Sequence, residues 1–145
     1  MPKFYHGTDL VTARRLAGVG QETGNIRVDR GGGEFGRGFY TQSSKSNALT
    51  WALNNPRTRR SACVLELDIP EAEYQQLEKL VLDVRKARQL RQRLSNQRLK
   101  GTYLAGVDVI TGPILNNASI EQQKFESQTS ETLLNDEQRT RRSIQ

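Results

Sequence analysis

Apolar and polar residues alternate along several short stretches of the chain, a pattern typical of half-buried β-strands. The clearest stretch is residues 62–69, where every second residue from Cys63 to Leu67 falls on one face. Similar but shorter patterns predict strands at residues 3–6, 25–28, 39–42, 107–110 and 121–126. The pair Gly112-Pro113 is expected to end the strand at 107–110.

Other segments repeat their apolar residues every three to four positions, which is the spacing of an amphipathic helix. They cover residues 9–16, 44–54, 71–99 and 129–134. Thr8 or Asp9 can cap the first helix, and Ser43 or Ser44 can cap the second. The region 71–99 is long for one helix, and we expect a break near Leu82.

Strands and helices therefore intermix without a regular strand–helix–strand rhythm. This arrangement predicts a mixed α+β domain rather than a doubly wound parallel sheet. The 145 residues are the size of one ordinary domain. We expect this domain to span residues 1–135. Residues 136–145 have almost no apolar side chains, which predicts a frayed C-terminal tail.

The composition and charge of the chain bear on its cellular location and on the partners that it can bind. A net charge of +6 favours an acidic partner, such as nucleic acid, an acidic protein face or a phosphorylated ligand. No apolar run is long enough to span a membrane, and no signal-peptide pattern is visible. The single cysteine, Cys63, is expected to be buried and inert, which fits a cytoplasmic protein. One histidine and one cysteine do not suggest a metal site.

The stretch GGGEFGRGFYTQ at residues 31–42 is the most unusual in the chain. A phosphate-binding loop would end in Gly-Lys-Ser/Thr and open a helix, whereas here a strand follows the glycines. A dinucleotide-binding fingerprint would follow a strong strand, and none precedes it. A surface loop that leads into the strand at 39–42 is therefore the simplest interpretation.

Two other residues are candidates for a site. His6 is the only histidine, and it ends a predicted strand just before Gly7. A lone histidine is more often structural, but a glycine after it lets a ligand approach the backbone. Tyr40 is either a core aromatic or the rim of a cleft, where it would stack on a flat ring. Strand alternation leaves open whether Phe39 or Tyr40 faces inward.

Together these motifs resemble a known family. FYHGT, followed by GGGEFGRGFYTQSSKSNALTWA, is similar to the ADP-ribosyltransferases of the His-Tyr-Glu type, the diphtheria-toxin-like group. Within this family the chain is most similar to an uncharacterised bacterial, toxin-like branch. DVITGPILN at 108–116 and QQKF at 122–125 are imperfect matches to later motifs of that branch. The resemblance implies a split mixed β-sheet core with peripheral helices, and NAD⁺ as the substrate.

The resemblance also implies roles for individual residues. His6 would hydrogen-bond a ribose, the Gly7 backbone would hold the nicotinamide carboxamide, and Tyr40 would stack on the nicotinamide ring. The whole implied NAD⁺-binding set is His6, Gly7, Thr8, Gly38, Tyr40 and Ser46. No metal is implied.

The third catalytic position departs from the family pattern. The family has glutamate there, on the last strand, whereas this chain has Gln122. Gln122 can position a ribose hydroxyl but carries no charge. Glu126 falls on the same strand face and is a candidate to supply the carboxylate, while Glu34 in the glycine loop is another. A glutamine here favours transfer of a single ADP-ribose over polymer extension.

The implied partners are a macromolecular acceptor and a cognate immunity or antitoxin protein. The acceptor would be an acidic protein or a nucleic acid, and the basic helical region 85–100 is either a docking surface for it or a solvated face. Two alternatives stay open. One is an NAD⁺ glycohydrolase that depletes NAD⁺, and the other is a catalytically weak nucleic-acid-binding module.

Overall fold

The computed structural model describes residues 2–18, 24–99 and 101–145. Its strands are β1 (Lys3–Asp9), β2 (Phe39–Gln42), β3 (Ala62–Asp68), β4 (Lys79–Val81), β5 (Val109–Ile114), β6 (Asn117–Phe125) and β7 (Arg141–Ile144). Its helices are α1 (Leu10–Ala17), α2 (Lys45–Asn54), α3 (Glu71–Gln75), α4 (Val84–Asn96) and α5 (Gln128–Asn135), with a 3₁₀ turn at Arg59–Ser61. The expected α+β class is therefore confirmed.

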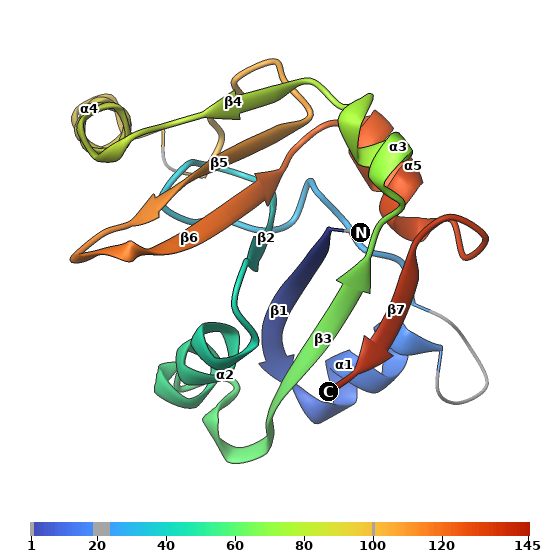
Figure 1. The fold of residues 1–145 in the computed structure, drawn as a ribbon. Helices are drawn as coiled ribbons and strands as arrows, with labels where there is room; N and C mark the ends of the chain where they lie inside the picture. The colour runs from blue at the N-terminus through green and yellow to red at the C-terminus, as the bar shows by residue number, and fades with distance from the viewer. Residues whose placement is uncertain (1, 19–23, 100) are drawn as a thin grey trace.

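The strands form one mixed sheet in the order β4-β5-β6-β2-β1-β3-β7. Only the β4–β5 pair is parallel. β1 and β3 are in register along all of β1, whereas β1 and β2 are in register only at Tyr5 and Gln42. The sheet therefore diverges between β2 and β1 into two halves, β4-β5-β6-β2 and β1-β3-β7 (Figure 1).

Two hydrophobic clusters hold the halves in place. The larger cluster contains Phe4, Leu65, Leu67 and Phe125, and it also takes in residues of α1 and α5. Phe4 and Phe125 meet edge to face at 5.7 Å, which joins β1 to β6 across the divergence. The smaller cluster lies under α4 and consists of Phe35, Leu82, Ala87, Leu90, Leu94 and Ile110.

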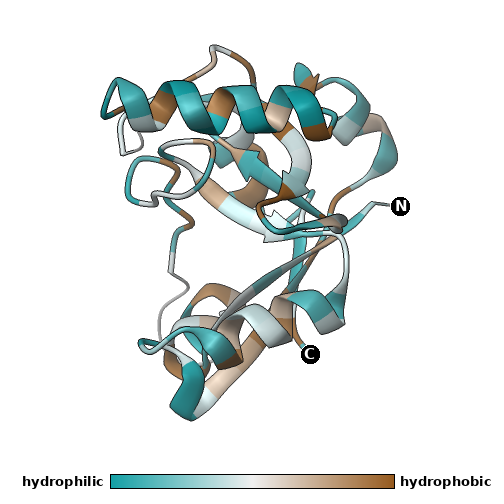
Figure 2. Cartoon of the chain, turned by 90° about the vertical axis from the view of Figure 1, so that its left-hand side faces the viewer, coloured by the Kyte–Doolittle hydropathy of each residue, from teal (hydrophilic) through white to brown (hydrophobic). Residues whose placement is uncertain are grey.

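The region 71–99 is not one interrupted helix. It forms α3, the short strand β4 and α4, and Asp83 caps α4 by accepting a hydrogen bond from the Lys86 amide at 2.8 Å. The break near Leu82 is confirmed, but helix at residues 79–81 is wrong, because that segment pairs with β5. In Figure 2, α4 crosses the top of the view as a mainly hydrophilic helix with apolar residues at intervals. Lys100, the last basic residue of this region, lies outside the described residues.

Residues 136–145 are ordered into the sheet, so the expected frayed tail is wrong. β7 pairs antiparallel with β3, from Leu65 opposite Ile144 to Asp68 opposite Arg141. Thr140, just before β7, is 1% exposed and donates to the Leu133 carbonyl at 2.7 Å. Backbone pairing fixes this segment, and such pairing needs few apolar side chains.

Several local predictions are confirmed. Asp9 caps α1 and Ser44 caps α2, each through a side-chain oxygen that accepts a backbone N–H. β2 covers the predicted residues 39–42. Gly112 and Pro113 lie inside β5 instead of ending it, a correction that follows from the pairing of β5 with β6. Among the described residues, no helix is both long and apolar enough to cross a membrane.

Candidate functional site

A cavity of about 830 Å³ opens where β1 and β2 stop pairing. Its wall includes residues of β1 and β2, the glycine loop 31–38, α1 and α2, together with Gln122 of β6. Of the residues that the sequence pointed to, it brings together His6, Gly7, Thr8, Gly38, Tyr40 and Gln122. Residues distant in sequence therefore meet at the point where the sheet splits.

His6 is partly buried on β1 and is held between two neighbours. Its ring stacks on Phe39 with centroids 4.3 Å apart, and Nδ1 lies 2.7 Å from the Tyr40 carbonyl oxygen. A carbonyl oxygen only accepts, so Nδ1 carries the proton and donates it. Burial lowers the pKa of His6 below its ordinary value, which favours the neutral ring. Nε2 of that neutral ring is an acceptor for a ligand hydroxyl.

Two of the glycines are required by packing. A Cβ on Gly7 would lie 2.2 Å from the Ala48 carbonyl oxygen of α2. A Cβ on Gly38 would lie 2.4 Å from Cγ of Lys124. Gly7 was expected to allow close approach of a ligand. However, the direction in which a Cβ would project from Gly7 points at α2. Its absent side chain therefore lets α2 sit directly against β1.

Tyr40 is anchored by its hydroxyl to the glycine loop. The hydroxyl donates to the Gly36 carbonyl at 2.5 Å and accepts from the Phe35 amide at 3.0 Å. A Cβ on Gly33 would lie 2.7 Å from Cζ of Tyr40, so this glycine rests against the hydroxyl end of the ring. Burial raises the pKa of Tyr40, so the hydroxyl stays protonated and keeps its donor role. Phe39 is the aromatic that faces the larger hydrophobic cluster. Tyr40 faces the other way, where it borders both the cavity and the smaller cluster.

Gln122 does not stand alone at the cavity. Its side-chain amide donates to Oε2 of Glu34 at 2.6 Å. Oε1 of the same carboxylate accepts from the Leu115 amide at 2.7 Å and lies 3.0 Å from Nε of Arg91. The glycine loop, the β5–β6 hairpin and α4 therefore meet at one carboxylate, which also lines the cavity.

Two predicted residues lie away from the cavity. Ser46 is at the exposed start of α2, where its hydroxyl meets the Ser44 hydroxyl at 2.9 Å. Glu126 was expected to share a site with Gln122, and the structure corrects this. Its carboxylate is 2% exposed, pairs with Nζ of Lys124 at 2.7 Å and accepts from the Gly106 amide at 3.0 Å. Past the end of β6, Glu126 serves as the counter-ion of a buried lysine.

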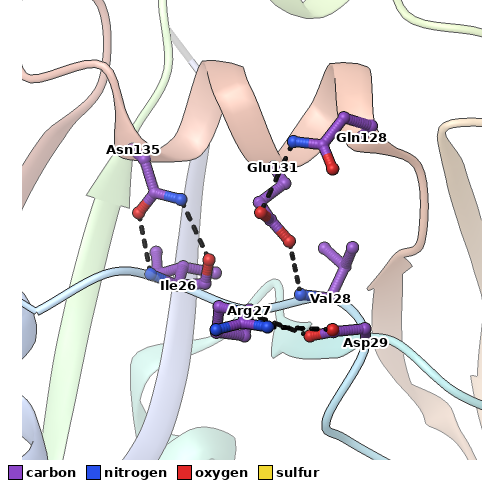
Figure 3. A network of polar contacts seen from close by, with 7 residues as sticks. All are labelled: Ile26, Arg27, Val28, Asp29, Gln128, Glu131 and Asn135. Atoms are coloured by element: carbon purple, nitrogen blue, oxygen red, sulfur yellow. Dashed lines mark hydrogen bonds and ion pairs between the residues drawn. The ribbon is translucent and has the colours of Figure 1, made fainter.

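Helix α5 fixes residues 26–28, of which Ile26 and Arg27 line the cavity (Figure 3). The Asn135 side chain accepts from the Ile26 amide at 2.7 Å and donates to its carbonyl at 2.9 Å. Glu131 accepts from the Val28 amide at 3.0 Å. The segment 25–28 was predicted as a strand and is not one, because helix side chains take the backbone groups that a neighbouring strand would take.

The sequence patterns did not predict that arginines would gather around the cavity. Arg15, Arg27, Arg30 and Arg57 all line it, while Glu34 is the one lining carboxylate among the described residues. Arg27 is paired with Asp29 at 3.0 Å. These arginines come from separate segments of ordinary composition, so only the fold gathers them. A concave wall of this charge suits an anionic ligand.

Within the ranges that the structure describes, no group of three or more His, Cys, Asp or Glu residues is arranged to hold a metal ion. The comparisons with known proteins leave the chain unassigned, since no protein-family model matches it and no curated protein is significantly similar.

Proposed function

We propose that the chain is an NAD⁺-dependent mono-ADP-ribosyltransferase with an ADP-ribosyltransferase-like split sheet. One observation carries the proposal: His6, Gly7, Thr8, Tyr40 and Gln122, drawn from three strands, line one cavity where β1 and β2 diverge. The sequence motifs that resemble the family therefore converge in space.

The size and charge of the cavity suit a dinucleotide. Its volume of about 830 Å³ lies in the range of ligand pockets, roughly 300 to 1,000 Å³. Arg15, Arg30 and Arg57 on its wall supply positive charge for a diphosphate. The divergence of β1 and β2 also favours binding of the nicotinamide end, because residues 6–9 of β1 have no register partner in β2 among the described residues. In the proposal, backbone groups on that edge, which β2 does not pair, hold the carboxamide.

In this proposal the neutral His6 accepts a ribose hydroxyl at Nε2. The Tyr40 ring flanks the nicotinamide, and the Tyr40 hydroxyl holds the loop that covers it. Gln122 positions a ribose hydroxyl. Positioning and electrostatic stabilisation of the ribosyl cation supply the rate enhancement, and no metal is needed.

The resemblance supplies the remaining parts of the proposal. The acceptor is a macromolecule, with protein favoured over nucleic acid, and the setting is a bacterial toxin or effector that acts in the cytoplasm. A cognate immunity or antitoxin protein then neutralises it. These parts rest on analogy at the level of the family.

The test uses NAD⁺ labelled in its adenylate half, incubated with the protein and a bacterial lysate. We expect label on a macromolecule together with release of nicotinamide. Tyr40→Ala should abolish both, because the ring and the loop anchor are lost together. Tyr74→Ala is the matched control, since Tyr74 is also partly buried but packs on Phe4 outside the cavity.

The labelled products of this reaction distinguish a protein acceptor, a nucleic-acid acceptor and a glycohydrolase. Label removed by protease indicates a protein acceptor, and label removed by nuclease indicates a nucleic-acid acceptor. Free ADP-ribose without labelled macromolecule indicates a glycohydrolase. Folded protein that neither binds NAD⁺ in calorimetry nor releases nicotinamide would rule out the proposal.

A further inference from the structure

Glu34 lines the cavity, but the proposed function gives it no role. It lies in the glycine loop, distant in sequence from the last long strand, yet its carboxylate reaches the side chain of Gln122 at 2.6 Å. Both residues line the cavity. The structure therefore places a negative charge immediately beside the neutral side-chain amide of Gln122 on β6.

The carboxylate is held in a fixed position. Oε1 accepts from the Leu115 amide and lies beside Arg91, while Oε2 accepts from Gln122. A carboxylate has about four acceptor positions, so these contacts leave roughly one open for a ligand. The side chain of Glu34 is 25% exposed, which is consistent with an open side.

The countercharge lies behind the carboxylate. Arg91 belongs to α4 and is not among the cavity-lining residues. Its guanidinium also donates to the Pro113 carbonyl and sits over the Phe35 ring, 5.3 Å from the centroid. These contacts hold the arginine away from the cavity, so it positions Glu34 without presenting its own charge to a ligand.

The other nearby carboxylates are engaged elsewhere. Glu126 is buried against Lys124. Glu121 is exposed and accepts from the Ser43 hydroxyl at 2.8 Å and from the side chain of Gln123 at 3.2 Å. Glu34 is therefore the one carboxylate, within the described part of the chain, that both touches Gln122 and faces the cavity.

We propose that Glu34 is the catalytic carboxylate of the site, delivered by the glycine loop to the position beside Gln122. The proposal rests on the proposed function. Glu34 stabilises the positive charge that develops on the ribose, while Gln122 orients a ribose hydroxyl. The two tasks that one glutamate would perform are divided between two residues.

The glycosidic C–N bond of NAD⁺ breaks, and its electron pair moves to the ring nitrogen, so nicotinamide leaves neutral. C1′ of the ribose takes the positive charge, which the Glu34 carboxylate faces. A lone pair of the acceptor forms the new bond to C1′, and the acceptor proton passes to solvent. With water as the acceptor, the products are ADP-ribose, nicotinamide and one proton.

The test measures nicotinamide release with water as the acceptor, and NAD⁺ affinity by calorimetry. Glu34→Gln keeps the shape and removes the charge. We expect kcat to fall on the order of 10²- to 10³-fold, as when other preorganised charge-stabilising groups are removed. The dissociation constant of NAD⁺ should change by less than about threefold, because the charge acts on the transition state.

A charge-swap variant gives a second, independent readout. Glu34→Gln combined with Gln122→Glu returns the carboxylate to within hydrogen-bond reach of its original place. We expect kcat of this double variant to be at least about tenfold higher than kcat of Glu34→Gln alone. Glu121→Gln is the matched control, since it removes the same charge one residue from Gln122 but outside the cavity, and it should keep the wild-type rate.

Three outcomes would overturn the inference. Unchanged kcat in Glu34→Gln removes the catalytic role. Loss of NAD⁺ affinity with unchanged kcat assigns Glu34 a binding role only. A swap variant no faster than Glu34→Gln also counts against it. These results leave the proposed function intact, whereas a wild-type protein that neither binds NAD⁺ nor releases nicotinamide ends both.

Discussion

Gln122 and Lys124, two consecutive residues on one face of β6, each meet a carboxylate, but in opposite environments. Gln122 meets Glu34 beside an open cavity. Lys124 forms an ion pair with Glu126, and the two side chains are 0% and 2% exposed. Both sites hold a carboxylate with a cationic partner, because Glu34 is paired with Arg91.

Burial is what separates the two sites. Charges removed from water must pair with each other, so the Lys124–Glu126 pair is committed to structure. Burial lowers the pKa of Lys124, and Glu126 opposes that effect. At the cavity, Glu34 keeps an open side and can respond to a ligand. The comparison shows that strand-face alternation alone does not identify which carboxylate reaches the cavity.

The largest expected effect comes from breaking the buried Lys124–Glu126 pair. Lys124→Met leaves Glu126 buried without its counter-ion, and we expect the free energy of unfolding to fall by about 3 to 5 kcal/mol. Chemical denaturation measures the loss. A double-mutant cycle with Glu126→Gln should show strong coupling between the two residues. A loss below about 1 kcal/mol would mean that the pair is more hydrated than its burial indicates.

The next effect concerns Tyr40, which lies opposite Lys124 in the register of β2 and β6. Tyr40→Phe removes the partner of the Phe35 amide and the Gly36 carbonyl, and should cost about 1 to 3 kcal/mol. Hydrogen exchange should accelerate at the Phe35 amide. Tyr103→Phe is the control, because Tyr103 packs on the same cluster and contacts Lys124 through its backbone carbonyl. Equal losses in the two variants would contradict a specific role for the Tyr40 hydroxyl.

A smaller effect follows from the titration of His6. Burial lowers its pKa in the folded state, so the unfolded chain binds the proton more readily. The stability is fully present above about pH 6.5, the ordinary pKa of histidine, and is lost as pH falls toward the folded-state pKa. The slope cannot exceed about 1.4 kcal/mol per pH unit. Denaturation between pH 7 and 5 should show a steeper loss in the wild type than in His6→Gln, and parallel curves would exclude this linkage.

The smallest expected effect on stability is that of Glu34→Gln. Its carboxylate and the Arg91 side chain are 25% and 14% exposed, so solvent screens the pair, and we expect a loss of about 1 kcal/mol or less. Thermal or chemical denaturation gives this value. A loss as large as that of Lys124→Met would erase the distinction between the partly exposed Glu34 site and the buried Lys124–Glu126 pair.

The local signals in the sequence predicted much of the framework. The caps at Asp9 and Ser44, the strand at 39–42 and the burial of Cys63 are set by near neighbours, and they are confirmed. The family resemblance implied that His6 and Tyr40 share one site, and the structure joins them through a 2.7 Å hydrogen bond from the His6 ring to the Tyr40 backbone carbonyl. Their roles toward NAD⁺ stay predictions.

The errors share one physical cause. Strand β4, strand β7 and the segment 25–28 take their backbone partners from distant parts of the chain: β5, β3 and α5. Their local patterns pointed elsewhere, because a hydrogen-bond partner far along the chain leaves no periodic mark on the segment it pairs with. The same holds for Glu126, whose place was decided by Lys124 and the Gly106 amide.

The sequence by itself determined the α+β class, the caps of α1 and α2 and a short set of candidate residues, since each depends on contacts within a few positions. The tertiary structure alone decided where the sheet splits, which arginines line the cavity and which carboxylate reaches it. Those properties depend on burial and on distances between segments far apart in the chain. Gln122 shows the division most clearly: the sequence gives a neutral amide at this position, and only the fold places the carboxylate of Glu34 beside it.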